Sequence, residues 1–575
     1  MRGSKLFSAH AEVKNANCLG GIDYAKEDFD CDQRVQAMGY VGEHSERMWL
    51  YRLICDLDLG KAAPGEENVE FSSIYSVNYF QDESNIVPLE DVDLLGHPHQ
   101  NIADQLVDGY FQTVHSTFPL IEKTTFLHQY RSFYSNRNMR PEKRWLAILN
   151  LIMAISARHS LLVNEQSLGN HDQHKVYFSR SWQLGMSGSI LSDDLNLQQV
   201  QIEALTAFYL LSIGQVHRSS RLLAVAIRSA MAMGLNCSQN DTIEAYSETR
   251  CRAWWALFMF DTVLCVIMGQ PPCIGRSNCT LPLPIPSEED FGVQRVVQRI
   301  TNQASRNTLI PSVFAEDPAA QAREDTLDHT NPAQYGSNTE VADEQSTHVP
   351  SLTPIHSMPS LLYMVDLSFL LREAIDTLYA PGAARRSWLE IELAISTFNT
   401  DADSWFSHLP VEFHATELAE ARPIVLQRIG LAFRFYTTKL IILQPCLRRL
   451  TRLPQPGSVC ETLATTCVQV AMQMINLLPE KVDVAWLYRV TPWWCVLHYI
   501  MQSTSVLLIA VFNQDLLNSR VTIGIGKKVE KAIRWIGEMS TKDSSSRRAW
   551  LFCRNLLCRH GSKLEYEIDL GLQEP

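Results

Sequence analysis

Residues 425–443 read VLQRIGLAFRFYTTKLIIL. Apolar side chains recur in this stretch at steps of three and four residues, which places them on one face of an α-helix: Val425, Ile429, Ala432, Phe433, Tyr436, Leu440 and Leu443. A second stretch, Trp254 to Met268, is apolar on nearly every side and carries Asp261 as its one charge. A helix of that composition belongs at the centre of a bundle. The sequence therefore predicts an all-α fold.

The same periodicity predicts further helices on both sides of these stretches. They lie around 49–57 and near 106–115, 125–134, 145–153, 175–190, 198–213, 218–233, 459–478, 493–512, 528–539 and 547–558. Pro141 is expected at a first helical position, and Gly234 is placed to end a helix. Alternating strand patterns are almost absent.

Composition divides the chain into five segments. Residues 1–36 are polar and lack periodicity, which predicts a disordered tail, and residues 37–285 form the first helical half. Ser, Thr, Asn, Asp, Gln, His and Pro dominate residues 286–358, which predicts a long disordered polar insertion. Residues 359–560 form the second helical half, and 561–575 a tail. We expect a multi-helix domain interrupted once.

Charge and hydropathy exclude some classes of protein. The chain has 575 residues, 46% hydrophobic and 20% charged, and a net charge of -13. A protein that binds DNA on its own usually carries a basic stripe, whereas the longest basic clusters here are short and are interpreted as solvated helix faces: Lys527-Lys528, Arg448-Arg449 with Arg452, and Arg547-Arg548. The sequence therefore disfavours direct DNA binding by this chain alone.

One uncharged run, between Arg489 and Asp515, is long enough to span a bilayer. His498 and Gln502 to Ser505 lie in its middle, which favours a helix buried inside protein. The first fifteen residues lack the continuous apolar core of a signal peptide. We expect no membrane partner and an intracellular protein.

Motifs for metal binding and catalysis are incomplete. The 14 cysteines include no CxxC, and the closest pairs, Cys553/Cys558, Cys273/Cys279 and Cys460/Cys467, are interpreted as packed thiols. Gly524-Ile525-Gly526 before Lys527 lacks a preceding strand, and the pairs Asp193-Asp194 and Asp401/Asp403 lack a third carboxylate. Arg158-His159 and His217-Arg218 are interpreted as helix-end or network residues. We predict no catalytic, cofactor-binding or metal-ligating residue, and no enzyme.

Two tryptophan pairs, Trp254-Trp255 and Trp493-Trp494, lie inside apolar runs. Core packing explains them, because large apolar helix residues are buried by default. The alternative is the wall of a ligand pocket between helices. The sequence leaves both interpretations open.

Several segments in order resemble one known family. Residues 109–121, GYFQTVHSTFPLI, are similar to the opening of the fungal-specific transcription factor domain, the middle homology region of Zn2Cys6 regulators. Four further segments resemble later or flanking motifs of that family: RLLAVAIRSAMAMGLN at 221–236, RCRAWWALFMFD at 250–261, GQPPCI at 269–274 and GYVGEHS at 39–45. Weaker likenesses occur at 433–439, 534–536 and 547–550.

The resemblance implies a nuclear regulator of transcription whose target is a metabolic gene cluster, such as one for a secondary metabolite. It also implies the transcription machinery, a homo- or heterodimer partner and a small-molecule effector as partners. The family's six-cysteine zinc cluster has no match here, since only Cys18, Cys31 and Cys55 occur in the first hundred residues. We therefore expect no zinc in this chain, and contact with promoter DNA that is either indirect or made through a missing N-terminal zinc cluster. The alternatives are a headless co-regulator or dominant-negative partner of a zinc-cluster factor, and a helical ligand-binding protein or enzyme.

Overall fold

The computed structural model describes residues 42, 44–59, 77–80, 82, 88–136, 140–163, 172–186, 195–238, 244–275, 278–284, 358–380, 382–409, 413, 422–513 and 524–561. Every element within those ranges is a helix, as predicted. The predicted tails, the predicted insertion up to residue 357 and the Asp193-Asp194 pair lie outside the described residues.

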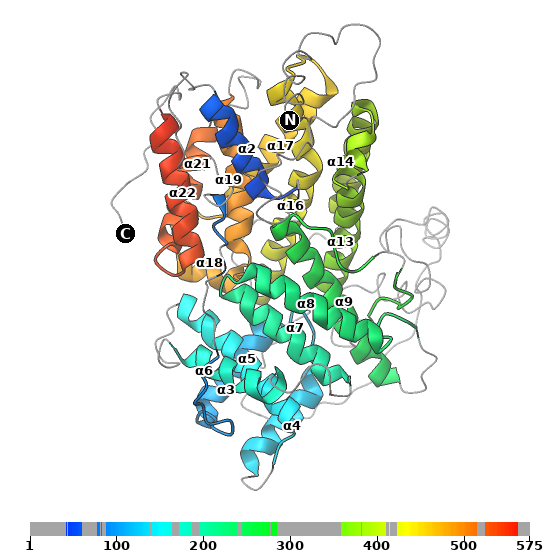
Figure 1. The fold of residues 1–575 in the computed structure, drawn as a ribbon, viewed down its shortest axis with the longest axis vertical. Coiled ribbons are helices and arrows are strands. Elements are labelled where there is room, and N and C mark those ends of the chain that lie inside the picture. Colours follow the sequence, from blue (N-terminus) through cyan, green and yellow to red (C-terminus); the bar gives the residue numbers. More distant parts are fainter. Residues whose placement is uncertain are drawn as a thin grey trace, which may run out of the picture.

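Within the described residues, the first half supplies the following elements of the bundle. They are α2 (Glu46–Leu59), α3 (Gln100–Thr113), α4 (Lys123–Ser135), α5 (Lys143–Leu162), α6 (Gln173–Ser181), the π-turn η4 (Trp182–Met186), α7 (Leu197–Ser212), α8 (Val216–Ala232) and α9 (Glu244–Met268). Helices α3 to α8 gather at one end of the molecule, while α2 packs at the other end among helices of the second half (Figure 1).

The second half supplies most of the opposite end. Its elements are α13 (Met358–Leu378), the 3₁₀ turn η6 (Ala383–Arg385), α14 (Trp388–Ser407), α16 (Arg422–Arg452), α17 (Val459–Asn476), α18 (Val484–Val490), α19 (Val496–Phe512), α21 (Ile525–Met539) and α22 (Ser544–His560). Helix α9 runs from the first group of helices into the second and packs against α13 (Figure 1). The two halves therefore share one core.

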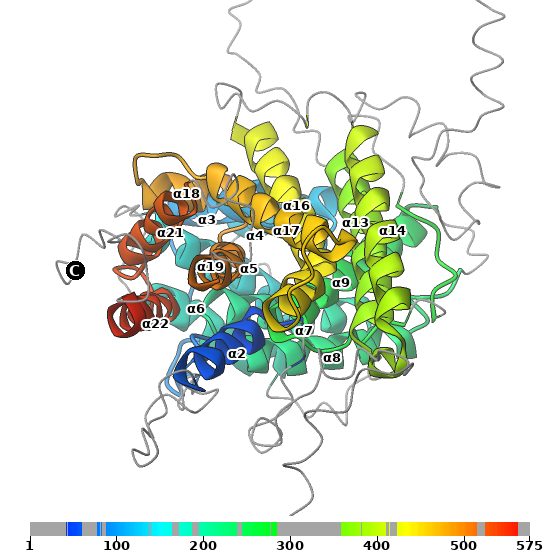
Figure 2. The same cartoon turned by 90° about the horizontal axis from the view of Figure 1, so that it is seen from above.

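Helix α19 lies at the centre of the second half, with α2, α16, α17 and α21 packed around it (Figure 2). All its residues from Val496 to Val511 are buried, including His498 and Gln502 to Ser505. Helices α5 and α9 are long and apolar enough to cross a membrane by length and composition, but 89% and 94% of the relevant windows are buried inside the protein. Burial in protein thus explains their composition.

Several predicted boundaries were wrong. Pro141 lies before α5, whose first residue is Lys143, with Glu142 at the N-cap. The α-helix expected at 175–190 ends at Ser181, and the π-turn η4 follows it directly. Gly185 in this π-turn packs against Ile202 and Ala147, and a Cβ at this position would come within 3.0–3.2 Å of their side chains. Gly234 does adopt a left-handed conformation, φ 66°, after α8.

The tryptophans at 493 and 494 precede α19 rather than lie inside it. Trp493 to Cys495 form a turn after Pro492, and the helix begins at Val496. Helices α14 and α18 were not predicted. Helix α14 begins with a capping box, in which the Ser387 hydroxyl accepts from the Glu390 N–H and the Glu390 carboxylate accepts from the Ser387 N–H.

Candidate functional site

Asp261 on α9 lies at the centre of a group of buried polar contacts, which we call the polar joint. Its carboxylate accepts from the N–H groups of Cys273 and Ile274, both at 3.1 Å, which fixes the turn after the helix. The Arg372 guanidinium on α13 pairs with the same carboxylate at 2.9 Å. The side chains of Asp261 and Arg372 are 6% and 7% exposed. Because the carboxylate is fully engaged by protein donors, this joint is structural.

The first turn of α2 and the residues just before it pack on the C-terminal end of α9. Arg47 donates to the Ile267 carbonyl at 3.3 Å, and the His44 Nε2 lies 3.2 Å from the Cys265 carbonyl oxygen. These contacts supply partners for carbonyls that end a helix without intrahelical donors. Gly42 meets Gly269 so closely that a Cβ on Gly42 would lie 1.3 Å from the Gly269 oxygen. Two motifs far apart in sequence therefore touch.

Next to these contacts, Glu46 and His498 form a buried acid–base pair. Glu46, the first residue of α2, lies 3.3 Å from His498 of α19 and accepts a hydrogen bond from the Tyr79 hydroxyl. Burial by itself would raise the pKa of Glu46, but His498, Arg47 and Tyr79 together hold it below its usual range. Burial lowers the pKa of neighbouring His44 to about 4, so its ring is neutral near pH 7.

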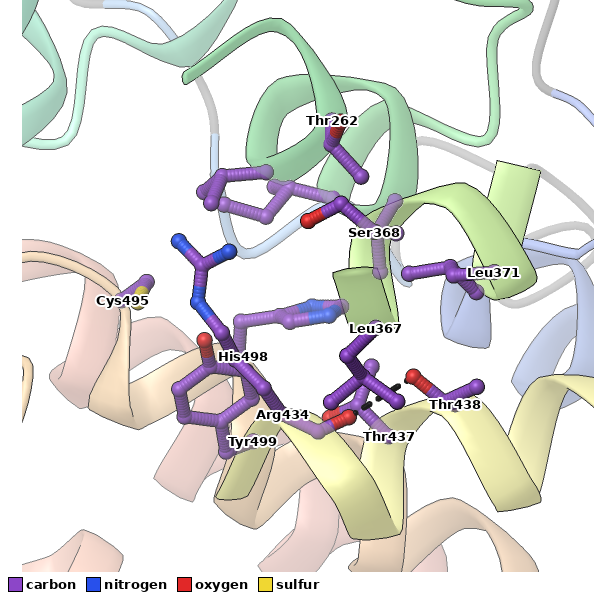
Figure 3. A pocket seen from close by; sticks show the side chains of 13 residues that line it. Thr262, Leu367, Ser368, Leu371, Arg434, Thr437, Thr438, Cys495, His498 and Tyr499 are labelled. Atoms are coloured by element: carbon purple, nitrogen blue, oxygen red, sulfur yellow. Dashed lines mark hydrogen bonds between the residues drawn. The ribbon is translucent and has the colours of Figure 1, made fainter. Parts of the chain in front are cut away.

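A small cavity lies beside this pair, between α9, α13, α16 and α19 (Figure 3). Its volume is about 30 Å³, which is room for about one water molecule. Polar lining residues include Thr262, Ser368, Arg434, Thr437 and His498. The Thr437 hydroxyl has no hydrogen-bond partner in the structure, which a bound water would provide. This cavity is too small for an organic ligand.

A second, much larger cleft separates the two helix groups. It has a volume of about 590 Å³, within the range of about 300–1,000 Å³ typical of small-molecule sites. On one side its lining comes from the ends of α5, α6 and α7, and on the other from α18, α21, α22 and the start of α19. We call it the inter-half cleft.

Arg158, near the end of α5, is the first polar group of the inter-half cleft. Its Nε donates to the Ser212 carbonyl at 3.4 Å, and no salt bridge to it is present among the described residues. The His174 Nδ1 lies 2.8 Å from the Tyr209 hydroxyl oxygen in the same cleft. Burial lowers the pKa of His174 to about 3, so the ring is neutral near pH 7.

The other charged groups of the cleft are engaged with protein. Asp172 and Lys175 form an exposed ion pair at 2.9 Å. Asp543 is the N-cap of α22 and accepts from the Ser546 N–H at 2.9 Å and from the Ser546 hydroxyl at 2.6 Å. Lys542 completes the charged lining, which thus holds three cationic side chains and two carboxylates.

Apolar side chains form the floor of the inter-half cleft. Trp493 and Trp494 meet edge to face with ring centroids 5.8 Å apart, and Phe178 stacks on Tyr209 at 4.4 Å. Leu161, Leu162, Leu211 and Leu497 add aliphatic surface. Polar side chains supply at least as much of the lining surface as these apolar ones, so the cleft is of mixed character.

The structure separates the two tryptophan pairs. Trp254 and Trp255 lie in the core, where their ring N–H groups donate to the Cys279 sulfur at 3.1 Å and the Pro282 carbonyl at 2.8 Å. Trp493 and Trp494 line the inter-half cleft. All four rings are buried, as the core interpretation predicted, and the ligand-pocket interpretation stays a prediction for Trp493 and Trp494.

The pairs Arg158-His159 and His217-Arg218 have different surroundings. Arg158 lines the cleft, which no local sequence pattern indicates. The neighbouring His159 ring lies 3.0 Å from the Tyr488 carbonyl oxygen. The N–H groups of His217 and Arg218 donate to the Asp82 carboxylate at the start of α8. The last two residues are structural.

The structure also locates the cysteine pairs, the Asp401/Asp403 pair and the glycines before Lys527. Cys460, Cys467 and Cys553 are buried, while Cys273 and Cys558 are exposed. Asp403 pairs with Lys439, and Gly524 begins α21 with φ 92°. In the part of the chain that the structure describes, no group of three His, Cys, Asp or Glu side chains is placed to hold a metal ion.

The basic clusters lie on helices, but the prediction that they are solvated faces was wrong for Arg449, which is buried, and for Arg448 and Arg548, which are partly buried. Arg448 pairs with Asp56 at 2.7 Å, and the Arg449 guanidinium lies over the Trp388 ring at 5.0 Å. Arg548 donates to the Tyr79 carbonyl at 2.9 Å. These arginines join helices to one another.

Comparison with known proteins now adds to the geometry. The model of the fungal specific transcription factor domain matches residues 107–409. Over 97% of its length the chain is 27% identical to the transcription regulator galc of Aspergillus niger and covers 72% of that protein. It is 22% identical to the sorbicillinoid biosynthetic cluster transcription factor 2 of Penicillium rubens over 76% of the chain, and covers 60% of that protein.

A shorter match, over 34% of the chain and 30% of the relative, is 24% identical to the terreic acid cluster-specific transcription factor atF of Aspergillus terreus. The family match begins in α3 and ends beyond α14, so it includes α9 with Asp261 and α13 with Arg372. The chain is thus a fungal-type transcription regulator, and it belongs to the family of proteins that carry the fungal-specific transcription factor domain.

Proposed function

We propose that this regulator acts in the nucleus, controls a metabolic gene cluster and responds to a small molecule bound in the inter-half cleft. The observation that carries the proposal is the family match over residues 107–409, because it includes α9 and α13, through which the two halves are joined. Two of the similar proteins are named for biosynthetic clusters, which supports a target of that kind.

The test is a deletion strain complemented with the tagged chain. We expect nuclear fluorescence and a coordinated change in the transcripts of neighbouring genes, restored by the complementing copy. A matched control is Arg131→Gln, which changes an exposed arginine on α4 and should complement fully. Cytosolic fluorescence together with unchanged transcripts would contradict the proposal.

A second candidate function is that of a co-regulator that reaches promoters through a zinc-cluster factor. The net charge of -13 favours it, since phosphate backbones repel an acidic partner. Affinity purification of the tagged chain should then recover a protein with a zinc cluster, and promoter occupancy should be lost when that protein is deleted. Promoter occupancy that persists without any such protein would rule the co-regulator out.

A further inference from the structure

We infer that Cys446 of α16 and Cys460 of α17 form a reversible disulfide when the protein meets a hydroperoxide, and that this bond restrains the corner between the two helices. We call residues 453–458, which join the end of α16 to the start of α17, the α16–α17 corner. The inference goes beyond the proposed function and does not rest on it, because the bond can be measured on the purified chain whatever genes the protein controls.

The two thiols touch inside the interface between α16 and α17, which lie side by side (Figure 2). The Cys460 thiol donates to the Cys446 carbonyl oxygen at 3.4 Å, and the two thiols share a hydrogen bond with each other. Cys446 is 0% and Cys460 3% exposed, so the surrounding protein keeps the pair in contact. A disulfide spans Cα–Cα distances of about 4.4–6.8 Å, which suits two residues whose side chains already reach one another.

Metal binding explains this contact less well than disulfide formation does. A third buried thiol, Cys467, lies seven residues after Cys460 on the same face of α17. Seven residues span about 10 Å along a helix, which is too far for Cys460 and Cys467 to hold one ion at the usual zinc–sulfur distance. Among the residues that the structure describes, no three metal-binding side chains are grouped around one point.

The α16–α17 corner gives an oxidant a route to Cys460. Cys460 is the second residue of α17, and Val459 before it is 57% exposed. Residues 452–457 are all exposed, and a Cβ at Gly457 would have nothing within 4 Å. Helix termini open locally at little cost in free energy, so fraying of the first turn of α17 uncovers Cys460. Cys446 is less accessible, because it lies six residues before the end of α16.

Cys460 is the first sulfur to be oxidised. The hydrogen bond with Cys460 and burial raise the pKa of Cys446 well above its usual range, so the Cys446 thiol stays protonated. The Cys460 thiolate attacks one peroxide oxygen, so that an S–O bond forms, the O–O bond breaks and water leaves.

The Cys446 sulfur then attacks the sulfenic sulfur of Cys460. The S–S bond forms, the S–O bond breaks, and hydroxide leaves with the Cys446 proton as a second water. The peroxide gains the two electrons that the two sulfurs lose, and a dithiol such as dithiothreitol returns them by thiol–disulfide exchange.

The disulfide restrains a point where other helices meet α16. Arg448 pairs with Asp56 of α2 at 2.7 Å, and the Arg449 guanidinium lies over the Trp388 ring of α14 at 5.0 Å. Both arginines follow Cys446 within one helical turn. Linking Cys446 to α17 also closes a loop of 14 residues, which lowers the entropy of the opened corner. We therefore expect the bond to oppose opening at this end of the molecule.

The experiment treats the purified, fully reduced chain with hydrogen peroxide. Remaining thiols are blocked in denaturant, and peptides are mapped by mass spectrometry without reduction. We expect a peptide pair joined through Cys446 and Cys460, absent before treatment and lost on reduction by dithiothreitol. Cys558, which is exposed on α22, sets the dose, because peroxide is raised until dimedone traps its sulfenic acid.

Four substitutions locate the bond and the route of the oxidant. Cys446→Ser and Cys460→Ser should each abolish the joined peptides, whereas the matched control Cys467→Ser, on the same face of α17, should leave them unchanged. Ser458→Ala removes the side-chain cap of α17 and should speed formation of the bond roughly fivefold, because the first turn frays more often. Circular dichroism and the urea midpoint of each variant confirm that it folds.

Recovery of Cys446 and Cys460 as free thiols, at a dose that labels Cys558, would overturn the inference. A bond from Cys460 to Cys467, or between two chains, would overturn the assignment of the pair. An unchanged rate in Ser458→Ala would overturn the route through the α16–α17 corner. Hydrogen exchange of residues 446–462 should be slower in the oxidised chain than in the reduced chain, and equal exchange would show that the bond does not restrain the corner.

Discussion

Arg372 of α13 is buried among polar groups of α9 and of the turn after it. Its guanidinium donates to Asp261, the Thr262 hydroxyl and the carbonyls of Phe258 and Ile274, all within 2.7–2.9 Å, and it stacks on Phe258 at 3.9 Å. At the scale of the residue, one side chain of the second half thus donates hydrogen bonds to several acceptors on α9 and on the turn that follows it.

Substitution of Arg372 by methionine should destabilise the protein strongly. The loss leaves Asp261 buried without its counter-charge, and removal of one partner of a buried pair typically costs about 3–5 kcal/mol. Urea unfolding measures the change. The double variant Asp261→Asn with Arg372→Met should recover part of the loss, because no unpaired charge remains. A double variant less stable than either single variant would show that the pair is not coupled in this way.

Gly269→Ala should cost more stability than Gly457→Ala, although both glycines have a left-handed backbone, φ 65° and 78°. The conformation alone costs about 1 kcal/mol at either site. A Cβ at Gly269 would also lie 2.7 Å from the Gly42 oxygen, whereas Gly457 has nothing within 4 Å. The difference between the two urea midpoints isolates the contact of the two motifs, and equal midpoints would show that the contact contributes nothing.

At the scale of the element, much of the fold was predictable. The helical face 425–443 became the middle of α16, and Trp254 to Met268 became the buried end of α9, because one period of 3.6 residues was visible in each. Helix α14 was missed although its capping box is visible in the sequence. Helix α18 is seven residues long, Val484–Val490, too short for periodicity to be distinguished from chance.

The inter-half cleft could not be predicted in the same way. Its walls come from helix ends that are up to several hundred residues apart, and no local pattern encodes which ends will face each other. Arg158 is an ordinary residue near the end of an apolar helix until α18 and α19 pack opposite it. The tryptophan pair at 493 and 494 is visible in the sequence, but the helix ends that pack around it are not.

The N-terminal end of α22 depends on its cap. Asp543→Ala should lower the free energy of unfolding by about 1 kcal/mol, because the Ser546 N–H loses its acceptor. Urea unfolding is the measurement. Ser458→Ala removes the equivalent cap of α17 on a helix outside the cleft and serves as the matched control. A change at Asp543 that exceeds the control several-fold would mean that the residue does more than cap its helix.

At the scale of the whole molecule, the first feature is a set of buried neutral histidines. Burial lowers the pKa of His44 and His159 to about 4, and that of His115 and His174 to about 3. An unfolded chain takes up protons at these rings below a pKa of about 6.5, whereas the folded chain does not. Stability therefore falls as the pH decreases from about 6.5 towards 4.

We expect a clearly lower urea midpoint at about pH 5 than at about pH 7.5, with each histidine contributing up to about 1.4 kcal/mol per pH unit in that window. Burial raises the pKa of Asp366 to about 6 and also raises the pKa of Glu203, Asp108 and Asp401, so these carboxyls oppose the trend, whereas His217, whose pKa burial lowers, adds to it. His159→Asn should reduce the slope of stability against pH, whatever its effect on the midpoint itself. An unchanged slope would mean that this ring does not stay neutral in the folded protein.

The joint between Asp261 and Arg372 has a consequence for the continuity of the chain. The two residues lie on opposite sides of the segment 285–357 in sequence, yet they share one carboxylate–guanidinium contact inside one core. A protease that cuts once within that segment would therefore yield two polypeptides that still elute together at the size of the uncut protein. They should separate only in denaturant, so the molecule behaves as a heterodimer whose subunits happen to be translated as one polypeptide.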